Sequence, residues 1–400
     1  MEKRLVLLTK YFPPEMGAPQ ARLYETLLGL KKRGWEVLVI TALPNYPKGK
    51  VFYGYRHKWH MKDEIDNIPI HRYALYASHS KKSIPRIISM LSFGFTSMFS
   101  MSRIRKFKPT YIITESPPLT LGLTGLALAR LTGAKHVMNV SDIWPLSALR
   151  LGAISEGYMY KKLEGLERYL YRRSYACMGQ SKEITTRLES DGSRKTLLFR
   201  NGVDFTRFET IRQSITKAER TNGLKIVYAG LLGIAQGVLD ICKNIDFASL
   251  NAELHIYGEG SEKEDIRAFI NKNPQRGIYL YSSVSREAIP ETLMRHHATL
   301  IPLVTPIYGA VPSKIYEAMA AGLPIIFSGG GEGETLIKEH NAGWTCTPSD
   351  YKAISETIAR VAKMDAGGLD IISNNCIKAA KGTFNREIQI ETLDRFLLST

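Results

Sequence analysis

A lysine and a glutamate stand one helical turn apart in the stretch VPSKIYEAMAAG, and their types point to phosphate and sugar chemistry. Pro312 and Ser313 are typical of a helix start, so the stretch predicts a short helix after an apolar strand. Glu317 then faces the same way as Ser313, beside the Lys314 ammonium and the free N–H groups of the first turn. A nucleoside diphosphate needs such donors for its phosphates and such a carboxylate for its ribose hydroxyls. The alternative is a capped surface helix with a solvated glutamate, but the alanines that follow favour close packing.

Glycines follow other apolar runs, at positions where a ligand could approach the backbone. Gly17 precedes a helix whose N-terminal N–H groups can face an anion, and Arg22 in that helix could reach the same anion. Gly230 and Gly258 lie in the turns YAGLLGIAQG and YGEG, where the lack of a side chain allows close approach. No GxGxxG fingerprint follows the first strand, which argues against a dinucleotide enzyme.

Asp142 lies in the segment NVSDIWP, where the chain leaves an apolar strand. A carboxylate in this place, beside Trp144, could contact a sugar hydroxyl or take part in catalysis. An aspartate that caps a helix or closes a turn before a proline is the alternative, and on residue types alone it is the commoner case.

Short apolar runs alternate with helical patterns along the whole chain. In the first half, strands are expected at 4–9, 36–42, 68–75, 111–116, 135–141, 175–181 and 195–201. In the second half they are expected at 224–230, 252–258, 277–283, 298–304 and 323–329. Continuous apolar runs are typical of buried parallel strands, and strand–helix alternation indicates a doubly wound α/β sheet. Ligands bind such sheets beyond the carboxyl ends of the strands, where Gly17, Asp142 and Glu317 are expected.

The alternation stops once and then restarts, which indicates two Rossmann-like domains. The segment 205–222 is polar and poor in strand signals, so it is expected to be a linker. The first domain is expected at 1–204 and the second at 223–382. Residues 383–400 predict a terminal helix that packs back on the first domain. The predicted fold class is therefore α/β, with two Rossmann-like domains.

The excess positive charge of the chain lies in its first half. The net charge is +16; residues 1–200 hold 33 Lys and Arg against 15 Asp and Glu, whereas residues 201–400 hold 21 against 23. A one-sided basic surface favours an anionic partner, such as a lipid leaflet, a phosphorylated carrier or nucleic acid. Charge that serves only solubility would be spread more evenly.

The segment 83–108 is expected to form a long apolar helix that ends in four cations. Arg86 and several serines interrupt it, which argues against a bilayer span. It could pack on the sheet with a basic, solvated end, or lie in a membrane interface with its cations on lipid phosphates. Both hold if one face packs and the rim touches lipid.

Cysteine usage and the start of the chain indicate a reducing compartment. The cysteines are far apart and form no CxxC pair, so neither a zinc site nor a disulfide framework is indicated. The first apolar run is too short for a signal peptide. A cytoplasmic protein with buried thiols is expected.

Together, the motifs YFPPEMGAPQAR, SDIWP, RNGVD, YGEG and VPSKIYEAMAAGLPII resemble those of the retaining GT-B glycosyltransferases of family 4, over nearly all of the chain. The combination is similar to the bacterial subgroup that builds O-antigen and capsule sugars, such as the N-acetyl-L-fucosamine transferases. The resemblance implies two domains that face each other across a cleft, the first for the acceptor and the second for the nucleotide-sugar. It also implies a UDP-linked donor and no metal or other cofactor.

The resemblance further implies roles for single residues. Glu317 would bind the ribose, and Asp142 would lie beside the transferred sugar; these two are the expected catalytic residues. The implied donor-binding residues are Gly17, Arg22, Asn201, Gly230, Gly258, Val284, Ser313, Lys314, Ile315 and Glu317.

Two departures from the family pattern concern the donor. Gly309 stands where the family motif places a first glutamate that contacts the donor sugar, so the identity of the sugar is not implied. Leu231 and Gln236 lie in the region where the family has an arginine and a lysine. Phosphate charge must then be met by Lys314, Arg22 or helix N-termini.

The expected function is transfer of a sugar, an N-acetylated hexosamine or deoxyhexosamine, from a UDP-sugar to a polyprenyl-diphosphate-linked saccharide. This reaction would serve O-antigen, lipopolysaccharide or capsule synthesis, with the basic first half held peripherally on the anionic inner face of the plasma membrane. A UDP-sugar epimerase of the same fold is the alternative, but it needs no basic face. A nucleic-acid binder is a third class, but no RNA- or DNA-binding module is recognisable, so nucleic acid is not an expected partner.

Overall fold

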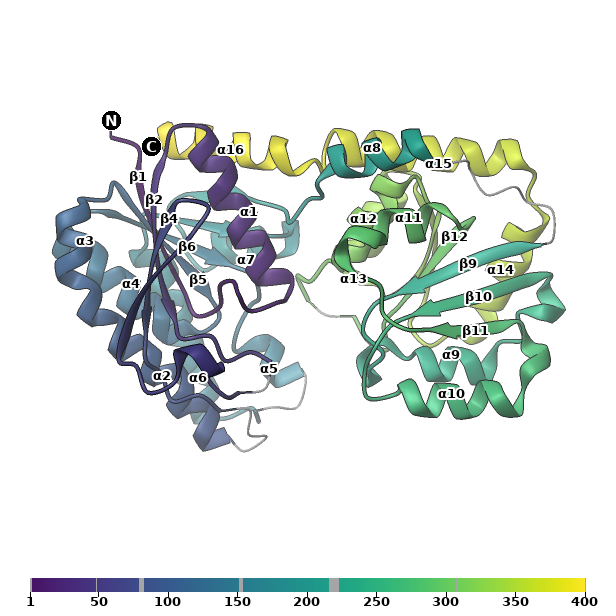
Figure 1. The fold of residues 1–400 in the computed structure, drawn as a ribbon, viewed down its shortest axis with the longest axis horizontal. Helices are drawn as coiled ribbons and strands as arrows, with labels where there is room; N and C mark the ends of the chain where they lie inside the picture. Colours follow the sequence, from purple (N-terminus) through teal and green to yellow (C-terminus); the bar gives the residue numbers. More distant parts are fainter. Residues whose placement is uncertain are drawn as a thin grey trace. The chain divides into compact units, whose positions relative to one another are not determined.

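The computed structural model describes residues 2–47, 49–78, 83–150, 154–215, 223–306 and 308–399. The chain divides into two compact units, each with its own sheet of mainly parallel strands (Figure 1). The first unit comprises Met1–Arg200 and Ile390–Thr400, and the second comprises Asn201–Gln389.

The sheet of the first unit contains all seven strands predicted for this half. They are β1 (Arg4–Thr9), β2 (Glu36–Ala42), β4 (Ile68–Tyr73), β5 (Tyr111–Ser116), β6 (Lys135–Val140), β7 (Ala176–Gly179) and β8 (Thr196–Leu198). In the described part of the chain the strand order is β3-β4-β2-β1-β5-β6-β7-β8. The order reverses at β1, which pairs in parallel with both β2 and β5. Such a reversal opens a crevice at the carboxyl end of the sheet.

Strand β3 (His60–Ile65) was not predicted. It pairs antiparallel with β4 at the sheet edge, through a hairpin whose turn residues Asp66 and Asn67 have φ of 49° and 55°. Its side chains alternate between partly buried and exposed, so it lacks the continuous apolar run of a central strand. The Asp-Asn pair, which tolerates positive φ, was the available signal.

Alternate residues of β1 serve the two faces of this sheet. Leu5 and Leu7 belong to a core with α1 (Ala18–Lys32). Val6 and Leu8 belong to a second core with α4 (Leu119–Thr132). Figure 1 shows α3 and α4 on one side of the sheet and α1 on the other.

The remaining helices of the first unit include two where one was predicted. The segment 83–108 forms α2 (Ser83–Ser97) and α3 (Met101–Phe107), joined by a 3₁₀ turn at Met98–Ser100. The others are α5 (Leu146–Arg150), α6 (Tyr158–Arg173) and α7 (Lys182–Ser190). No helix in the described ranges is long and apolar enough to cross a bilayer.

The second unit has a fully parallel sheet in its described residues, in the order β11-β10-β9-β12-β13-β14. Its strands are β9 (Leu224–Ala229), β10 (Ala252–Tyr257), β11 (Ile278–Tyr281), β12 (Ala298–Pro302), β13 (Ile325–Ser328) and β14 (Gly343–Cys346). The five predicted strands form, and β14, a short edge strand with little burial, was missed. The order reverses at β9, which lies between β10 and β12.

The helices of the second unit include one in the predicted linker. They are α8 (Phe205–Ser214), α9 (Val238–Asn244), α10 (Lys263–Lys272), α11 (Ile289–Met294), α12 (Ser313–Ala321), α13 (Gly331–Glu339), α14 (Tyr351–Lys363) and α15 (Ala366–Lys381). The linker expected at 205–222 is therefore corrected in part: α8 belongs to the second unit, and residues 216–222 lie outside the described ranges.

Helix α8 has sequence signals that its polar composition masks. Asp204 caps it by accepting a hydrogen bond from the backbone N–H of Arg207 at 3.2 Å. Phe205 and Phe208 follow at helical spacing and are buried. The helix is amphipathic, and the boundary between the units falls earlier, after Arg200.

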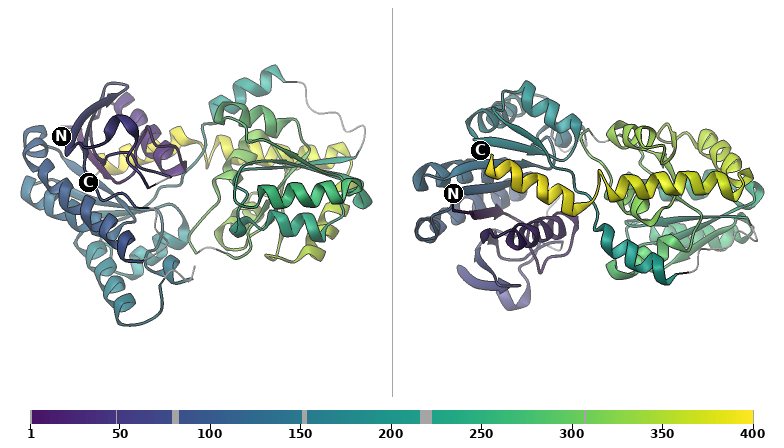
Figure 2. Two further views of the ribbon diagram at one scale, coloured as in Figure 1. Left: turned by 60° about the horizontal axis from the view of Figure 1, so that its bottom comes forward. Right: turned by 90° about the horizontal axis from the view of Figure 1, so that it is seen from above.

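The terminal helix α16 (Arg386–Leu398) packs on the first unit, as predicted. Ile390, Leu393 and Leu397 are buried there. The Trp35 indole N–H donates to Asp394 at 2.7 Å, and the Tyr111 hydroxyl donates to the carbonyl of Leu397 at 2.7 Å. Figure 2 shows α16 beside α1, where a Cβ at Gly29 would overlap Ile390.

Candidate functional site

The predicted Lys314–Glu317 stretch forms a helix at the carboxyl end of β12. Helix α12 begins at Ser313 after Pro312 and ends at Gly322, whose φ of 68° suits a glycine C-cap. The side chain of Ile315 is buried in the core, so only its backbone can face a ligand. Ser313 is exposed in the first turn. The helix thus presents its free N–H groups at the strand end.

Lys314 lies in a space that the neighbouring strand leaves open. Its ammonium sits 3.9 Å from the centroid of the Tyr228 ring, on β9. A Cβ at Gly230 would overlap the end of the Lys314 side chain, so glycine there makes room for it. Burial lowers the pKa of Lys314 to about 8, and the nearby Glu317 opposes this shift. Desolvation of a cation favours its pairing with an anion.

Glu317 is surrounded by positive charge. Burial raises the pKa of its carboxyl above the ordinary value. Four cations of the same unit oppose that rise: Arg286, Arg207, Lys314 and Arg386. The second unit therefore gathers cations around one carboxylate at the reversal of its sheet, which suits a ligand with both hydroxyls and phosphates.

Three of these cations, Arg207, Arg286 and Arg386, were not found from the sequence. Arg207 lies on α8, which was interpreted as linker, and its guanidinium donates to the backbone carbonyl of Arg286. Arg286 lies in a 3₁₀ turn after β11, two residues beyond Val284. All three are distant in sequence from Glu317, and only Arg286, in a turn that follows a strand end, carried a signal.

Glycines hold the loops after β9 and β10 against each other. Gly230 donates its N–H to the carbonyl of Tyr257 at 2.8 Å. A Cβ at Gly258 would overlap the carbonyl of Gly230, so no other residue fits without movement. The predicted glycines 230 and 258 therefore share one close backbone contact beside Lys314.

Two further residues of the predicted donor set, Val284 and Asn201, and the departure at Gly309 can be located in the structure. Val284 is partly buried after β11, and Asn201 is partly buried at the start of the second unit. Gly309, which replaces the expected glutamate, is buried with φ of 73°. That backbone conformation would strain a glutamate at this position.

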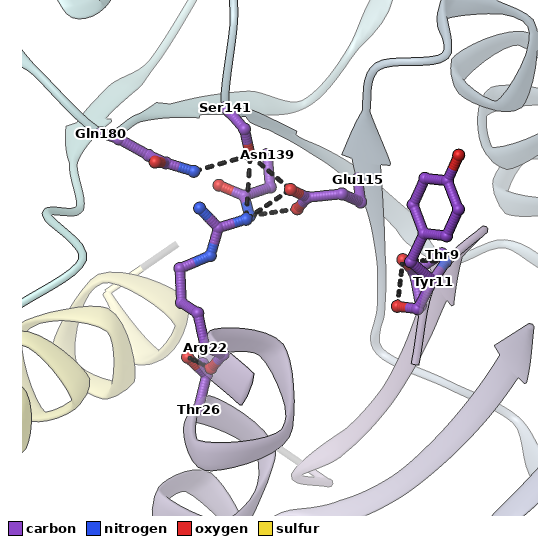
Figure 3. Close-up of polar contacts among 8 residues, drawn as sticks. All are labelled: Thr9, Tyr11, Arg22, Thr26, Glu115, Asn139, Ser141 and Gln180. Carbon is purple, nitrogen blue, oxygen red and sulfur yellow. Dashed lines mark hydrogen bonds and ion pairs between the residues drawn. The ribbon is translucent and has the colours of Figure 1, made fainter. Parts of the chain in front are cut away.

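In the first unit, a polar network lies at the carboxyl ends of β5 and β6 (Figure 3). The Arg22 guanidinium pairs with the Glu115 carboxylate, and it donates to the Ser141 hydroxyl at 2.9 Å. Ser141 donates in turn to Glu115. The Asn139 amide donates to Glu115 at 2.6 Å, and the Gln180 amide donates to Ser141 at 2.6 Å. These side chains come from four separate elements.

This network bears on the role predicted for Arg22. Its side chain and that of Glu115 are only 7% and 8% exposed. Arg22 therefore neutralises a buried carboxylate, and its contact with the donor stays a prediction. Sequence reasoning missed Glu115, because its partner lies 93 residues away.

Gly17 and Asp142 flank the network in sequence. Gly17 is exposed at the N-cap of α1, with an extended backbone and no side-chain cap. Asp142 follows Ser141 and accepts a hydrogen bond from the Ser147 hydroxyl at 2.7 Å, across the start of α5. Burial raises the pKa of Asp142, and the hydrogen bonds from Ser147 and the Ile143 backbone oppose the rise. Asp142 thus closes a turn, as the alternative interpretation expected, and its contact with a sugar stays a prediction.

The described residues contain no cluster of three or more His, Cys, Asp or Glu side chains placed to hold a metal ion. The four cysteines are free and buried.

Two family models match the chain. The glycosyl transferase 4-like domain matches residues 17–202, and glycosyl transferases group 1 matches residues 209–383. A glycosyl transferase of Escherichia coli K12 named for colanic acid biosynthesis, WcaI, is 26% identical over 326 residues, covering 78% of this chain and 79% of that protein.

A second relative and a solved structure add detail. The UDP-Gal:α-D-GlcNAc-diphosphoundecaprenol α-1,3-galactosyltransferase of Escherichia coli is 23% identical, covering 75% of this chain and 78% of that protein. The crystal structure of HepE from Anabaena with UDP-glucose has a TM-score of 0.67 at 14% identity, covering 99% of this chain and all of that one. This likeness shows the GT-B fold.

Proposed function

This chain is a glycosyltransferase of group 1 with the GT-B fold, and from that premise we propose that it moves a sugar from a UDP-sugar to a polyprenyl-diphosphate-linked saccharide. The sugar proposed is an N-acetylated hexosamine or deoxyhexosamine, transferred with retention at the anomeric carbon. The product would enter a surface polysaccharide such as O-antigen or capsule.

The observation that carries the proposal is Glu317 among four cations beside the start of α12. In this proposal the Glu317 carboxylate accepts hydrogen bonds from the paired ribose hydroxyls. Lys314 and the first N–H groups of α12 take the diphosphate, with Arg286 supplying positive charge. Gly230 and Gly258 let the donor approach the backbone. These cations stand in for the arginine and lysine that the chain lacks near Leu231.

The proposed mechanism depends on charge at the leaving group. As the bond to the transferred sugar breaks, negative charge grows on the diphosphate, and preorganised cations stabilise that charge. Lys314 is already desolvated, so it needs little solvent reorganisation. The leaving phosphate takes the acceptor proton on the same face of the sugar, and Asp142 orients the acceptor or the sugar.

The acceptor proposal rests on relatives and on charge. One relative is named for transfer to a diphosphoundecaprenol-linked sugar and another for colanic acid biosynthesis. The excess positive charge of residues 1–200 suits an anionic lipid carrier and the anionic inner face of the plasma membrane. We place the enzyme there, peripherally bound, with its first unit toward the acceptor.

A thermal-shift panel of nucleotide-sugars tests the proposal. A donor at 100 times its dissociation constant adds about 2.7 kcal/mol to the free energy of unfolding, which raises the midpoint measurably. We expect the shift with UDP and UDP-N-acetylhexosamines, and a smaller shift for Glu317→Ala. No shift with any nucleotide-sugar would contradict the donor site, and a shift with GDP- or ADP-sugars alone would contradict the base assignment.

A further inference from the structure

Helix α2 carries its large apolar side chains on the face that points away from the domain. Ile88, Leu91, Phe95 and Phe99 are 45%, 51%, 67% and 52% exposed. Their spacing of three, four and four residues places them on one side of α2 and of the 3₁₀ turn that continues it. A helix that covers a core normally has this face buried.

The opposite face of α2 is buried; it combines one large apolar side chain, Phe93, with hydroxylic residues. Ser89, Thr96 and Ser97 are at most 6% exposed. Thr96 donates to the carbonyl of Ala74 at 2.6 Å, and the Thr124 hydroxyl on α4 donates to the carbonyl of Gly94 at 2.9 Å. The helix thus docks through Phe93, close backbone approach and hydrogen bonds, and its four exposed apolar side chains lie outside this packing.

Aromatic contacts extend this face beyond the helix. Trp59, which precedes β3, is 53% exposed and meets Phe99 edge-on with ring centroids 5.5 Å apart. Phe95 meets Phe99 in the same manner at 5.7 Å. Trp59, Ile88, Leu91, Phe95 and Phe99 form one apolar surface, called here the α2 face. Tryptophan is favoured at membrane–water interfaces, where an apolar ring meets polar headgroups.

The charged side chains of the segment that contains α2 and α3 are all positive. The sequence between Asp66 and Glu115 contains no Asp or Glu and eight Lys or Arg. Arg56 and Lys58 are exposed next to Trp59, and Arg105 and Lys106 are exposed on α3. An apolar patch flanked by cations on α3 and beside Trp59 complements an anionic lipid surface. A second copy of this chain is a poor occupant, because it brings the same positive charge.

We propose that the α2 face is an in-plane membrane anchor, in which Trp59, Phe95 and Phe99 insert among the acyl chains of an anionic leaflet while the flanking cations bind lipid phosphates. The role of the anchor, which is to bring the first unit to a lipid-linked acceptor, rests on the proposed function. Binding to lipid itself requires no sugar substrate.

The test measures sedimentation of the full chain with vesicles, without nucleotide or acceptor. The vesicles are phosphatidylcholine alone and equal parts phosphatidylcholine and phosphatidylglycerol. We expect binding to the mixed vesicles, and a loss of about tenfold or more in the partition coefficient for the Phe95→Ser/Phe99→Ser variant. The control is Ile371→Ser/Ile388→Ser, which removes exposed apolar side chains elsewhere (65% and 40% exposed) and should bind like the parent.

A second measurement separates insertion from adsorption by charge. Vesicles with brominated acyl chains should quench the fluorescence of Trp59, and a Trp59→Tyr variant should lose that quenching. Unchanged vesicle binding by the double serine variant would overturn the anchor, as would binding without quenching. A dimer that the double serine variant dissociates, with no vesicle binding, would assign the face to a second copy and also overturn it. The double serine variant should keep the thermal shift with UDP-sugars. Failure of the anchor can therefore be distinguished from failure of the proposed donor site.

Discussion

The strand order reverses once in the sheet of each unit, at β1 and at β9, but the charged residues near the two reversals differ. In the first unit, Arg22 pairs with Glu115, and that carboxylate also accepts hydrogen bonds from the Asn139 amide and the Ser141 hydroxyl. In the second unit, four cations act on the single carboxylate of Glu317. A neutralised pair serves positioning and stability, whereas a carboxylate among cations suits a ligand that brings its own negative charge. The comparison therefore supports the proposal that the second unit binds the nucleotide.

The largest effect is expected from a variant that breaks the buried ion pair of Arg22 and Glu115. Arg22→Met leaves the Glu115 carboxylate buried without its cation, and the free energy of unfolding should fall by about 3–5 kcal/mol. Urea unfolding followed by tryptophan fluorescence measures this, because Trp35, Trp59 and Trp144 lie in the first unit.

Two variants control for this result. Arg295→Met removes an exposed pair with Glu291 and should cost at most about 1 kcal/mol. The double variant Arg22→Met/Glu115→Gln should regain part of the lost stability, because no uncompensated charge remains. Equal losses for Arg22→Met and Arg295→Met would contradict the buried pair.

The next largest effect is expected from removal of the Glu317 carboxylate in the second unit. Glu317→Ala should lower kcat/KM by roughly 100- to 1000-fold, since charge-assisted hydrogen bonds to two ribose hydroxyls each contribute about 1.5–3 kcal/mol. Transfer rates and UDP affinity by calorimetry check this. Glu334→Gln, which alters an exposed pair with Lys338 on α13, should leave both unchanged. Transfer at the parent rate by Glu317→Ala would mean that the ribose is held elsewhere.

A smaller effect is expected from a variant that displaces the Lys314 side chain but keeps the lysine. Gly230→Ala puts a Cβ where the lysine side chain lies, and the φ of 150° at this position adds strain. We expect UDP affinity to fall by about tenfold, near the value of one hydrogen bond to a charged group. Gly367→Ala on α15 meets only one atom, at 3.8 Å, and is the matched control. Equal UDP affinity in both variants would show that the position of Lys314 does not matter.

The smallest effect is a pH dependence from Lys314. Its folded-state pKa of about 8 lies below the ordinary 10.5, so the charged ammonium opposes folding below pH 8, and this cost is relieved as pH rises toward 10.5. Donor binding has the opposite sign, because the diphosphate needs the ammonium. UDP affinity should fall by up to about tenfold from pH 8 to pH 9. The fall should be absent in Lys314→Arg, whose guanidinium stays charged. A fall of the same size in Lys314→Arg would assign it to another group.

Sequence reasoning predicted the central strands well, because a strand buried on both faces must be apolar throughout. It missed β3 and β14, which lie at sheet edges and carry half-exposed side chains. It also read α8 as linker, because the helix buries only a narrow stripe that includes Phe205 and Phe208. Elements with one exposed side have weaker patterns.

The sequence by itself determined the alternation of strands and helices, the start and end of α12, and the pairing of Lys314 with Glu317 on one turn. These follow from local rules: strand burial, helix capping and the spacing of residues within a helix. Only the tertiary structure decided which charges are neutralised. Glu115 reaches Arg22 from 93 residues away, and Arg286 reaches Glu317 from a different loop. The stability of a charged side chain depends on its burial and on the charges near it. Those neighbours are brought together by the order of strands in the sheet, which local sequence does not encode.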